Sequence, residues 1–387
     1  MSDDTDAAIV QLRGAGRALI LSGSIGKGHD VVAEACAAAL AEAGFGSAVV
    51  DCMALLGGAG SKAGDLFFRG LLGIPGAYDA FHFGHLRQGS RLSTLFDKTA
   101  ARKLVGPVRR LIAEQRAELV LSVFPTGAAA VDRLKGEFPQ LRSVVYCTDA
   151  CPHRLWVHDG TDMFLVTAEE SAAFVNYHRP GAPVAVVPAA ARPAFHRAPT
   201  RAQARAELGL PRHGRVVLLM AGSWGLAPLD GIAAALSAGG MHVLAVAGTN
   251  GKLERRLMAL DGRDPRVTSF GFTDRIPELM AAADLVITTA GDTCTEARVV
   301  GRPMLLLDTV PGHGRENIQL ELTRGQAWAT AAHPEVVAAA AGRILDGAVA
   351  PPLYRPPTEE EWDRTFLAAL GPLGLRLEGE AAGGTRR

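Results

Sequence analysis

Residues 19–40 read LILSGSIGKGHDVVAEACAAAL, and this pattern indicates a strand, a glycine-rich turn and a helix. The apolar run at 17–22 is short and nearly uninterrupted, which is typical of a strand that is buried on both faces. Small and apolar residues with helical spacing follow from Val31 onward. A strand that passes through a tight turn into a helix is the repeating unit of α/β domains with parallel sheets.

The turn at 23–30, GSIGKGHD, is open to three interpretations. A P-loop would carry its lysine directly after the last glycine, whereas Lys27 precedes Gly28 here and His29 follows it. The spacing G-x-x-G-x-G also departs from the dinucleotide fingerprint, although Asp51 ends the next strand, where a ribose-binding acid would stand. The other interpretations are a purely structural turn, and a turn that places His29 at a helix start facing a cleft between domains. Imidazole titrates near neutral pH, so His29 would suit a general base.

The same alternation of apolar runs and helix-length segments continues along the 387 residues, which predicts parallel sheets covered on both faces. The segment 188–200, PAAARPAFHRAPT, holds three prolines and has no periodicity, so it predicts a linker. We therefore expect an N-terminal Rossmann-like domain at 1–190 and a second one at 198–350. The apolar pattern of 358–372 predicts a last helix that returns to the first domain. The predicted strands are 17–22, 47–51, 119–123, 143–147, 163–166, 184–187, 215–220, 241–247, 266–269, 284–288 and 303–307.

Composition limits the class of protein. The 40 basic and 40 acidic residues balance, which argues against a nucleic-acid binder. Five dispersed cysteines without a CxxC motif fit a reducing cytoplasm and suggest no zinc site. The acidic start MSDDTDAA lacks the features of a signal peptide, and no apolar run is long enough for a membrane helix. The abundance of Ala, Arg and Gly is typical of a bacterial source with a GC-rich genome.

One loop of the first predicted domain gathers side chains suited to chemistry. The segment 146–158, YCTDACPHRLWVH, follows a predicted strand and holds Thr148, Asp149, His153 and Trp156. Ligands of doubly wound sheets bind beyond the carboxyl ends of the strands. Asp149 would orient a histidine or receive a proton there; alone, it would equally fit a helix cap.

The second predicted domain carries three segments of this kind, each following a predicted strand. The turn 221–226, AGSWGL, would present backbone N–H groups to a phosphate. The segment 271–280, GFTDRIPELM, predicts a helix that starts at Asp274. The segment 288–317 contains two predicted helix starts with polar groups suited to sugar hydroxyls, among them Glu296, whose carboxylate could accept both ribose hydroxyls. Each segment alone would also fit an ordinary helix cap.

The segment 61–110 differs from the rest, because an aromatic and leucine-rich part, FFRGLLGIPGAYDAFHFGHL, precedes a basic part. Such a pairing is typical of a peripheral contact with an anionic membrane surface. The alternative is an ordinary buried helix with a solvated basic face. The expected location is accordingly the cytoplasm, either free or on the inner face of the membrane.

The ordered set of motifs resembles the family of monogalactosyldiacylglycerol synthases and processive diacylglycerol glucosyltransferases, which is related to the transferase that adds N-acetylglucosamine to lipid-linked muramyl peptide. The resemblance covers roughly residues 17–330. The motifs are G-x-G-H at 26–29, T-D…H-x-x-W at 148–156, G-F-x-x-x-[MI] at 271–276, A-G…T-x-x-E at 290–296 and P-G…x-x-N at 311–317.

The resemblance implies a GT-B fold, in which two Rossmann-like domains face a central cleft. It implies a UDP-sugar donor held by the C-terminal domain and an acceptor held by the N-terminal domain. The donor-binding residues that we expect are Gly222, Ser223, Trp224, Gly271, Phe272, Ile276, Gly291, Asp292, Thr293, Glu296, Glu316 and Asn317. The acceptor-binding residues are Gly28, Thr126, His153 and Trp156, and the catalytic residues are His29, assisted by Asp149.

By the same resemblance, the backbone around Phe272 and Ile276 would hold uracil, Glu296 the ribose, and the 222–225 turn with Thr293 the diphosphate. The family needs no bound metal and no cofactor beyond the UDP-sugar, and it inverts the anomeric centre. The sequence departs from the family where a Lys-Pro-Gly-Gly-like run is replaced by 289–292, which places Asp292 beside the expected diphosphate. Trp224 is also bulky for a phosphate turn.

The leading hypothesis is therefore a UDP-sugar-dependent hexosyltransferase that acts on a hydroxyl of a lipid such as diacylglycerol or of a small natural product. Two alternatives remain. A UDP-sugar 2-epimerase with the same fold would act without any acceptor, and a nucleotide-sugar-binding protein would bind the donor without turnover.

Overall fold

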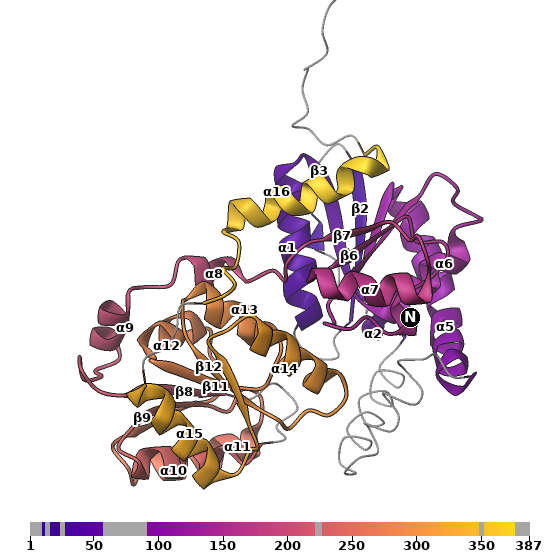
Figure 1. Cartoon of the computed structure of the whole chain (residues 1–387). Coiled ribbons are helices and arrows are strands. Elements are labelled where there is room, and N and C mark those ends of the chain that lie inside the picture. Colours follow the sequence, from indigo (N-terminus) through magenta and orange to yellow (C-terminus); the bar gives the residue numbers. More distant parts are fainter. Residues whose placement is uncertain are drawn as a thin grey trace, which may run out of the picture. The chain divides into compact units, whose positions relative to one another are not determined.

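The computed structural model describes residues 10–11, 16–23, 28–56, 91–220, 227–347 and 352–375 (Figure 1). The chain divides into two compact units, the first made of Met1–Ala190 with Glu360–Arg387 and the second of Ala191–Glu359. The division falls inside the proline-containing segment 188–200. Each unit holds its own largely parallel sheet, so the predicted α/β class is confirmed.

The sheet of the first unit has six parallel strands in the order β3-β2-β4-β5-β6-β7, with the short β1 paired antiparallel to β3 at one edge. Strand β3 is therefore added on one side of β2, and β4 and the strands that follow it are added in order on the other side. Its strands are β1 (Val10–Gln11), β2 (Gly16–Ser22), β3 (Phe45–Asp51), β4 (Leu119–Ser122), β5 (Arg142–Cys147), β6 (Met163–Val166) and β7 (Val184–Val186).

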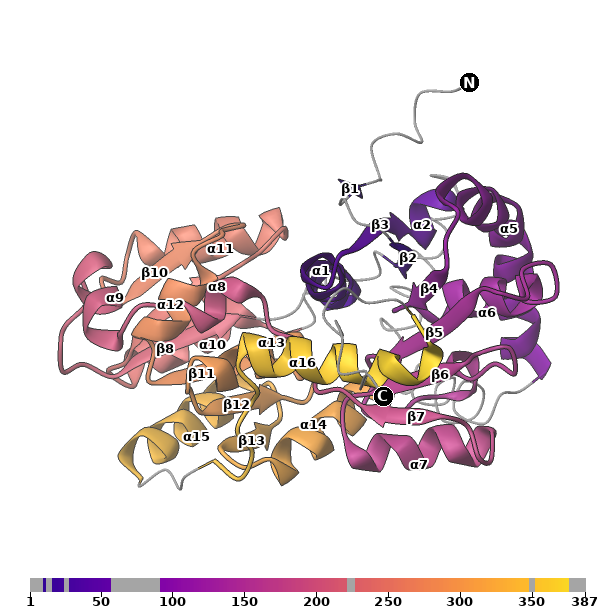
Figure 2. The same cartoon turned by 90° about the horizontal axis from the view of Figure 1, so that it is seen from above.

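Both faces of this sheet are buried, and alternate residues of β2 show how. Ala18 and Ile20 pack with α1 (Gly28–Glu42) and α16 (Glu359–Leu370) on one face. Leu19 and Leu21 pack with α2 (Cys52–Leu55), α5 (Arg91–Gln115) and α6 (Pro125–Leu134) on the other face. Figure 2 shows α1 on one side of the sheet and α5 and α6 on the other. Because successive strand residues point to opposite faces, the whole run must be apolar. The unit is completed by η3 (Arg154–Trp156), α7 (Glu169–His178) and η4 (Gly371–Leu373).

The sheet of the second unit is entirely parallel in the order β10-β9-β8-β11-β12-β13, which is the strand order of dinucleotide-binding Rossmann sheets. Helices α10, α11 and α15 cover one face and α12, α13 and α14 the other, as Figure 1 shows. The strands are β8 (Val216–Met220), β9 (His242–Val246), β10 (Val267–Phe270), β11 (Leu285–Thr288), β12 (Met304–Leu307) and β13 (Ala327–Thr330). The helices are α8 (Pro193–His196), α9 (Arg201–Glu207), α10 (Leu229–Ala238), α11 (Gly251–Asp261), α12 (Ile276–Ala282), α13 (Asp292–Val299), α14 (His313–Thr323) and α15 (Pro334–Asp346).

Each sheet has one point where the chain reverses its direction of strand addition, and this point is where ligands of such sheets bind. In the first unit it lies between the carboxyl ends of β2 and β4, because α1 and α6 leave toward opposite faces. In the second unit it lies between β8 and β11, from which α10 and α13 leave toward opposite faces. The fold thus places two candidate binding edges, one in each unit.

Some sequence predictions of local structure were wrong. The strands β1 and β13 were not predicted. β13 lies at the edge of its sheet and is partly exposed, with Trp328 37% exposed. The predicted helix start at Asp274 moves to Ile276, because Thr273 accepts a hydrogen bond from the N–H of Arg275 and Pro277 sits in the first turn. Such a turn followed by proline fixes the helix start two residues later.

The predicted membrane segment 61–110 is described only in part, since 57–90 lie outside the described residues. In the described part of α5, Leu104 and Val108 pack into the core, whereas Arg102, Lys103 and Arg110 are exposed. In the described part of α5 the apolar side is thus used by the fold, and the basic side faces solvent. None of the helices in the described part of the chain combines the length and apolar character that a bilayer crossing requires.

Helix α16 provides the first prediction. Phe366 is fully buried against the first unit and stacks on Trp362, whose indole N–H donates to the Pro188 carbonyl at 2.7 Å. We expect Phe366→Ala to lower the free energy of unfolding by about 3–5 kcal/mol, since it removes a large buried ring. Urea unfolding followed by circular dichroism measures this. Arg364→Ala, on the exposed face of the same helix, is the control, and a similar loss for both variants would contradict the packing role.

Candidate functional site

The first candidate site is a set of ring contacts around His29 at the carboxyl edge of the first sheet. His29 is the second residue of α1, directly after the turn that follows β2. Its ring lies 5.3 Å from that of Phe124 in an edge-on contact and 6.2 Å from the ring of Trp156. Its Nδ1 is 3.5 Å from Oγ1 of Thr148, at the long limit of a hydrogen bond. The ring is therefore held between loops that follow β4 and β5.

The start of α1 is fixed by small and polar residues on either side of the turn. Ser22, the last residue of β2, donates a hydrogen bond to Oδ1 of Asp30 at 2.8 Å. Gly23 has no room for a side chain, because a Cβ there would lie 2.5 Å from Cγ of Phe124. The first glycine of the GSIGKGHD turn thus permits the close approach of β2 to the aromatic ring that supports His29.

Asp149 accepts its hydrogen bond from the indole N–H of Trp156, at 2.7 Å. Nε2 of His153 lies 3.6 Å from the same oxygen. Nδ1 of His153 accepts from the backbone N–H of Leu155, so in the neutral ring Nε2 carries the proton and faces the carboxylate. The predicted loop residues are thus brought together, with Asp149 holding Trp156 and His153 in place. Trp156 in turn contacts the His29 ring.

Two further predicted acceptor residues lie at helix starts on the same edge. Gly28 is the first residue of α1, and Thr126 is the second residue of α6. Both are partly exposed. Asp51, the candidate ribose acid of the dinucleotide interpretation, accepts a hydrogen bond from the N–H of Met53 and caps α2.

The second candidate site centres on Glu296 in α13, which follows β11. Its side chain is 5% exposed, and Nε of Arg192 donates a hydrogen bond to its Oε1 at 2.8 Å. Burial raises the pKa of the Glu296 carboxyl above its ordinary value, Arg192 opposes this, and the nearby Asp292 adds to it. A buried carboxylate that accepts one hydrogen bond from a cation still has acceptor positions for hydroxyl groups.

The other predicted groups of this segment gather at two neighbouring helix starts. Gly291 precedes α13, and Asp292 and Thr293 form its first turn. Glu316 and Asn317 lie in the first turns of α14 and are partly exposed. Because β11 and β12 are adjacent and parallel, the two helix starts share the carboxyl edge of the sheet.

The predicted uracil segment follows β10, three strands from β11 in the sheet order. At about 4.8 Å per strand, the two loops are about 14 Å apart along the edge, a span suited to an extended nucleotide. Gly271 packs against the Glu254 carboxylate, Phe272 is 62% exposed, and the side chain of Ile276 is buried in the core. Ile276 can therefore offer a ligand its backbone only.

The predicted phosphate turn with Gly222, Ser223 and Trp224 lies outside the described residues. Within the described residues, no group of three His, Cys, Asp or Glu side chains is arranged to hold a metal ion.

Two contributors to these sites were not predicted from the sequence. Phe124 precedes α6 and supports His29, and Arg192 pairs with Glu296 from 104 positions earlier in the chain. Phe124 could have been found by its position, since it follows the strand next to β2 in the sheet. Arg192 lies in a segment predicted to be a linker, and no local pattern marks it.

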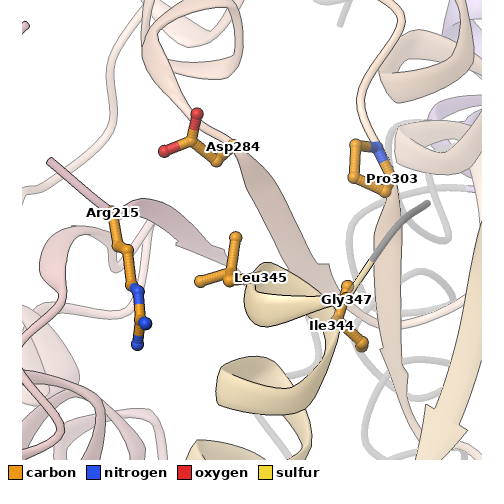
Figure 3. A pocket seen from close by; sticks show the side chains of 6 residues that line it. All are labelled: Arg215, Asp284, Pro303, Ile344, Leu345 and Gly347. Atoms are coloured by element: carbon orange, nitrogen blue, oxygen red, sulfur yellow. The ribbon is translucent and has the colours of Figure 1, made fainter. Parts of the chain in front are cut away.

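A pocket of about 220 Å³ lies at the opposite, amino edge of the second sheet (Figure 3). Arg215, Asp284 and Pro303 line it from positions just before β8, β11 and β12. Asp284 accepts hydrogen bonds from Arg205 and from the N–H of Val216. These contacts tie the amino ends of neighbouring elements together, so this pocket is not part of the candidate site.

Two family models match the chain, one in each unit. Residues 29–177 match the model of monogalactosyldiacylglycerol (MGDG) synthase, and residues 218–322 match the C-terminal domain of glycosyltransferase family 28. The first match begins at His29 and includes the 148–156 loop. The second includes Glu296 and Asn317. The resemblance inferred from the sequence motifs is thereby confirmed for both halves.

Known relatives agree with these matches. The processive diacylglycerol β-glucosyltransferase of Bacillus subtilis is 27% identical over 244 residues, which are 61% of this chain and 63% of that protein. The transferase of Mycobacterium bovis that is named for UDP-N-acetylglucosamine and an undecaprenol-linked acceptor is 37% identical over 166 residues, 40% of each chain. The chain thus spans less than two thirds of the length of the curated relatives that it matches.

Solved structures confirm the GT-B fold. MurG of Acinetobacter baumannii aligns with a TM-score of 0.53 at 14% identity, covering 92% of this chain and 94% of that one. The UDP-GlcNAc 2-epimerase of Methanocaldococcus jannaschii aligns with a TM-score of 0.56 at 10% identity, covering 92% and 100%. Transferases and epimerases share this fold, so the fold alone does not separate the two activities.

The tight approach at Gly23 gives the second prediction. Gly23→Ala would place a Cβ against the ring of Phe124, so we expect a destabilisation of about 1–3 kcal/mol through overpacking. Thermal unfolding measures it. Gly136→Ala is the matched control, because nothing lies within 4 Å of a Cβ at that position. Equal melting temperatures for Gly23→Ala and the wild type would show that the Phe124 ring can shift without loss of stability.

Proposed function

We propose that this protein transfers a hexose from a UDP-sugar to a hydroxyl group of a lipid acceptor of the diacylglycerol type. The observation that carries the proposal is the pair of family matches, an MGDG synthase match that begins at His29 and a glycosyltransferase family 28 match that contains Glu296. Relatives named for diacylglycerol and for UDP-N-acetylglucosamine support the acceptor class and the donor class.

The donor nucleotide would bind along the carboxyl edge of the second sheet. The backbone around Phe272 would face uracil, Glu296 would accept the ribose hydroxyls, and the start of α13 would face the diphosphate. Asp292 adds a negative charge at this helix start, where the backbone N–H groups favour an anion. We infer that Asp292 contacts the sugar hydroxyls rather than the phosphates, because its repulsion of a phosphate would weaken donor binding. Glu316 and Asn317 would serve the same sugar.

The reaction would proceed by direct displacement. As the acceptor oxygen forms its bond to the anomeric carbon, His29 takes the hydroxyl proton and UDP leaves with the electrons of the broken C–O bond. One displacement inverts the anomeric centre. The chain's own donors, the helix start and backbone N–H groups, would stabilise the leaving diphosphate, so we propose that turnover needs no metal ion.

The ring surroundings of His29 fit a lipid acceptor better than a highly polar one. Phe124 and Trp156 flank the imidazole, so aromatic rings form two of the described walls beside it, and Thr148 adds a hydroxyl. Such walls suit a hydroxyl next to acyl chains.

The activity is tested by incubating the protein with UDP-glucose, UDP-galactose and UDP-N-acetylglucosamine, with and without diacylglycerol in detergent micelles. We expect UDP release that depends on the acceptor and a glycosylated lipid by mass spectrometry. Release of UDP or formation of an epimerised donor without acceptor would contradict the transferase and indicate a UDP-sugar 2-epimerase instead. Thermal stabilisation by a donor without any product would indicate a protein that binds nucleotide sugars but does not turn them over.

The role of His29 is tested in the same assay. We expect His29→Ala to lower kcat by at least ~10²-fold, the usual contribution of a general base, while the dissociation constant for UDP stays unchanged. His213→Ala, an exposed histidine outside both family matches, is the control. Near-normal turnover by His29→Ala would remove His29 from proton transfer.

A membrane contact through the basic side of α5 is the remaining part of the proposal. We expect binding to anionic vesicles that weakens with salt, since exposed charges are screened. Replacing Arg102, Lys103 and Arg110 by serine should lower the partition coefficient by roughly 10²-fold, at about 1 kcal/mol per basic residue. Vesicle sedimentation measures this, with vesicles of zwitterionic phosphatidylcholine, which carry no net charge, as the control. Binding that is indifferent to salt and to these changes would leave α5 as an ordinary surface helix.

A further inference from the structure

Arg192 joins the buried core of the second unit to the proposed ribose site. It stands directly before α8, outside the helices and strands of the sheet. Its guanidinium lies over the ring of Phe195, with Cζ 4.8 Å from the ring centroid. Phe195 is itself 1% exposed and belongs to the core on the α13 face. The arginine is thus held on one side by a fixed aromatic surface.

On its other side the same guanidinium meets Glu296. Nε of Arg192 donates to Oε1 at 2.8 Å, a distance typical of a charge-assisted hydrogen bond. The two partners differ strongly in burial, since the Glu296 side chain is 5% exposed and the Arg192 side chain 43%. The arginine therefore reaches from the surface to a carboxylate that solvent hardly touches.

This contact favours the charged form of Glu296 and so opposes the effect of burial. Burial favours the protonated carboxyl and raises its pKa, and Asp292, one turn earlier on α13, raises it further. Arg192, reaching in from the segment before α8, is the group that acts in the opposite direction. Glu296 lies beyond the first turn of α13, where the favourable field of a helix start has fallen off.

The geometry also leaves Glu296 with capacity to bind. Oε1 accepts one hydrogen bond from Arg192, and among the described residues no donor contacts Oε2. An ionised carboxylate has about four acceptor positions, so one side is fixed by the arginine and the other is available to two neighbouring hydroxyl groups. A cis-diol such as that of ribose matches this arrangement.

We propose that Arg192 is a positioning residue of the donor site, which keeps the buried Glu296 carboxylate ionised and oriented toward the ribose diol of the nucleotide. The inference rests on the proposed function, because it takes UDP as the ligand of the second unit. It adds a residue that lies outside the matched segment 218–322. The arginine acts through the glutamate, and its own exposed N–H groups are not needed for contact with the nucleotide.

The experiment compares the binding of UDP and 2′,3′-dideoxy-UDP to the full-length protein by titration calorimetry. The wild type should prefer UDP, since each hydrogen bond from a hydroxyl to a charged group contributes roughly tenfold to 10²-fold in affinity. Arg192→Met keeps an apolar stem over Phe195 and removes the charge, so most of this preference should disappear. Arg192→Lys restores a charge and should recover part of it.

The pH dependence separates positioning from simple packing. UDP affinity should be full at a pH above the pKa of Glu296 and should fall as the pH drops through it. In Arg192→Met the pKa of Glu296 rises further, because Arg192 is lost while burial and Asp292 remain, so the fall should begin at a higher pH. Arg197→Met is the matched control, since Arg197 lies just after α8 and pairs with Glu359 at the surface.

A double variant distinguishes loss of positioning from a folding defect caused by Arg192→Met. Arg192→Met leaves a buried charge without its partner, so its melting temperature is measured first. Glu296→Gln removes that charge, and Arg192→Met/Glu296→Gln should bind UDP no more weakly than Glu296→Gln alone, because an arginine that acts only through Glu296 has nothing left to position.

Each contrary result has its own meaning. If Arg192→Met weakens UDP and dideoxy-UDP equally, or weakens Glu296→Gln further, the arginine contacts the diphosphate and the inference is overturned. An unchanged preference in Arg192→Met overturns it as well. If the wild type binds UDP but shows no preference, or if Glu296→Gln keeps it, the ribose role of Glu296 fails. Absence of any UDP binding would instead contradict the proposed function.

Discussion

The burial of both faces of two parallel sheets is the constraint on which the rest of this structure depends. Leu19 and Ile20 are neighbours in one strand, yet each is fully buried in a different core. A strand in that position has no face left for polar side chains, so chemistry is confined to its carboxyl end. His29 follows such an end in the first unit, and Glu296 follows one in the second.

The two units use this shared constraint for different chemistry. Around His29 the strand ends contribute Phe124 and Trp156, and the polar Asp149 is engaged in holding the indole. Around Glu296 the strand ends contribute carboxylates, an amide and hydroxyls at two helix starts. The first arrangement suits an apolar molecule with one reactive hydroxyl, and the second suits a ligand with many hydroxyl groups and phosphates. These surroundings support the proposed division into acceptor and donor units.

How far the sequence predicts the structure depends on how locally each feature is encoded. Doubly buried strands are continuous apolar runs, so β2, β4 and β11 were found without difficulty. β13, AWAT, was missed because it is an edge strand with Trp328 partly exposed and alanines around it. The helix starts next to His29 and before Glu296 were predicted because each comes a few residues after a strand. The Arg192–Glu296 pair could not be predicted from the sequence, because a single ion pair between residues 104 positions apart leaves no periodic signal.

The same pair shows why a residue in a predicted linker can matter to a binding site. A carboxylate with a 5% exposed side chain is costly unless a cation accompanies it. The helices of a Rossmann unit that lie beside it supply mainly apolar side chains, because they must cover the sheet. Helix α13 does carry a buried cation, Arg298, but that guanidinium pairs with Glu321 of α14, and the partner of Glu296 comes from the stretch before α8. Its position is set by Phe195, which is anchored in the same core as Cys294 and Ala297 of α13. The core thus fixes both ends of the ion pair, and the orientation of Glu296 follows from packing that no ligand has to provide.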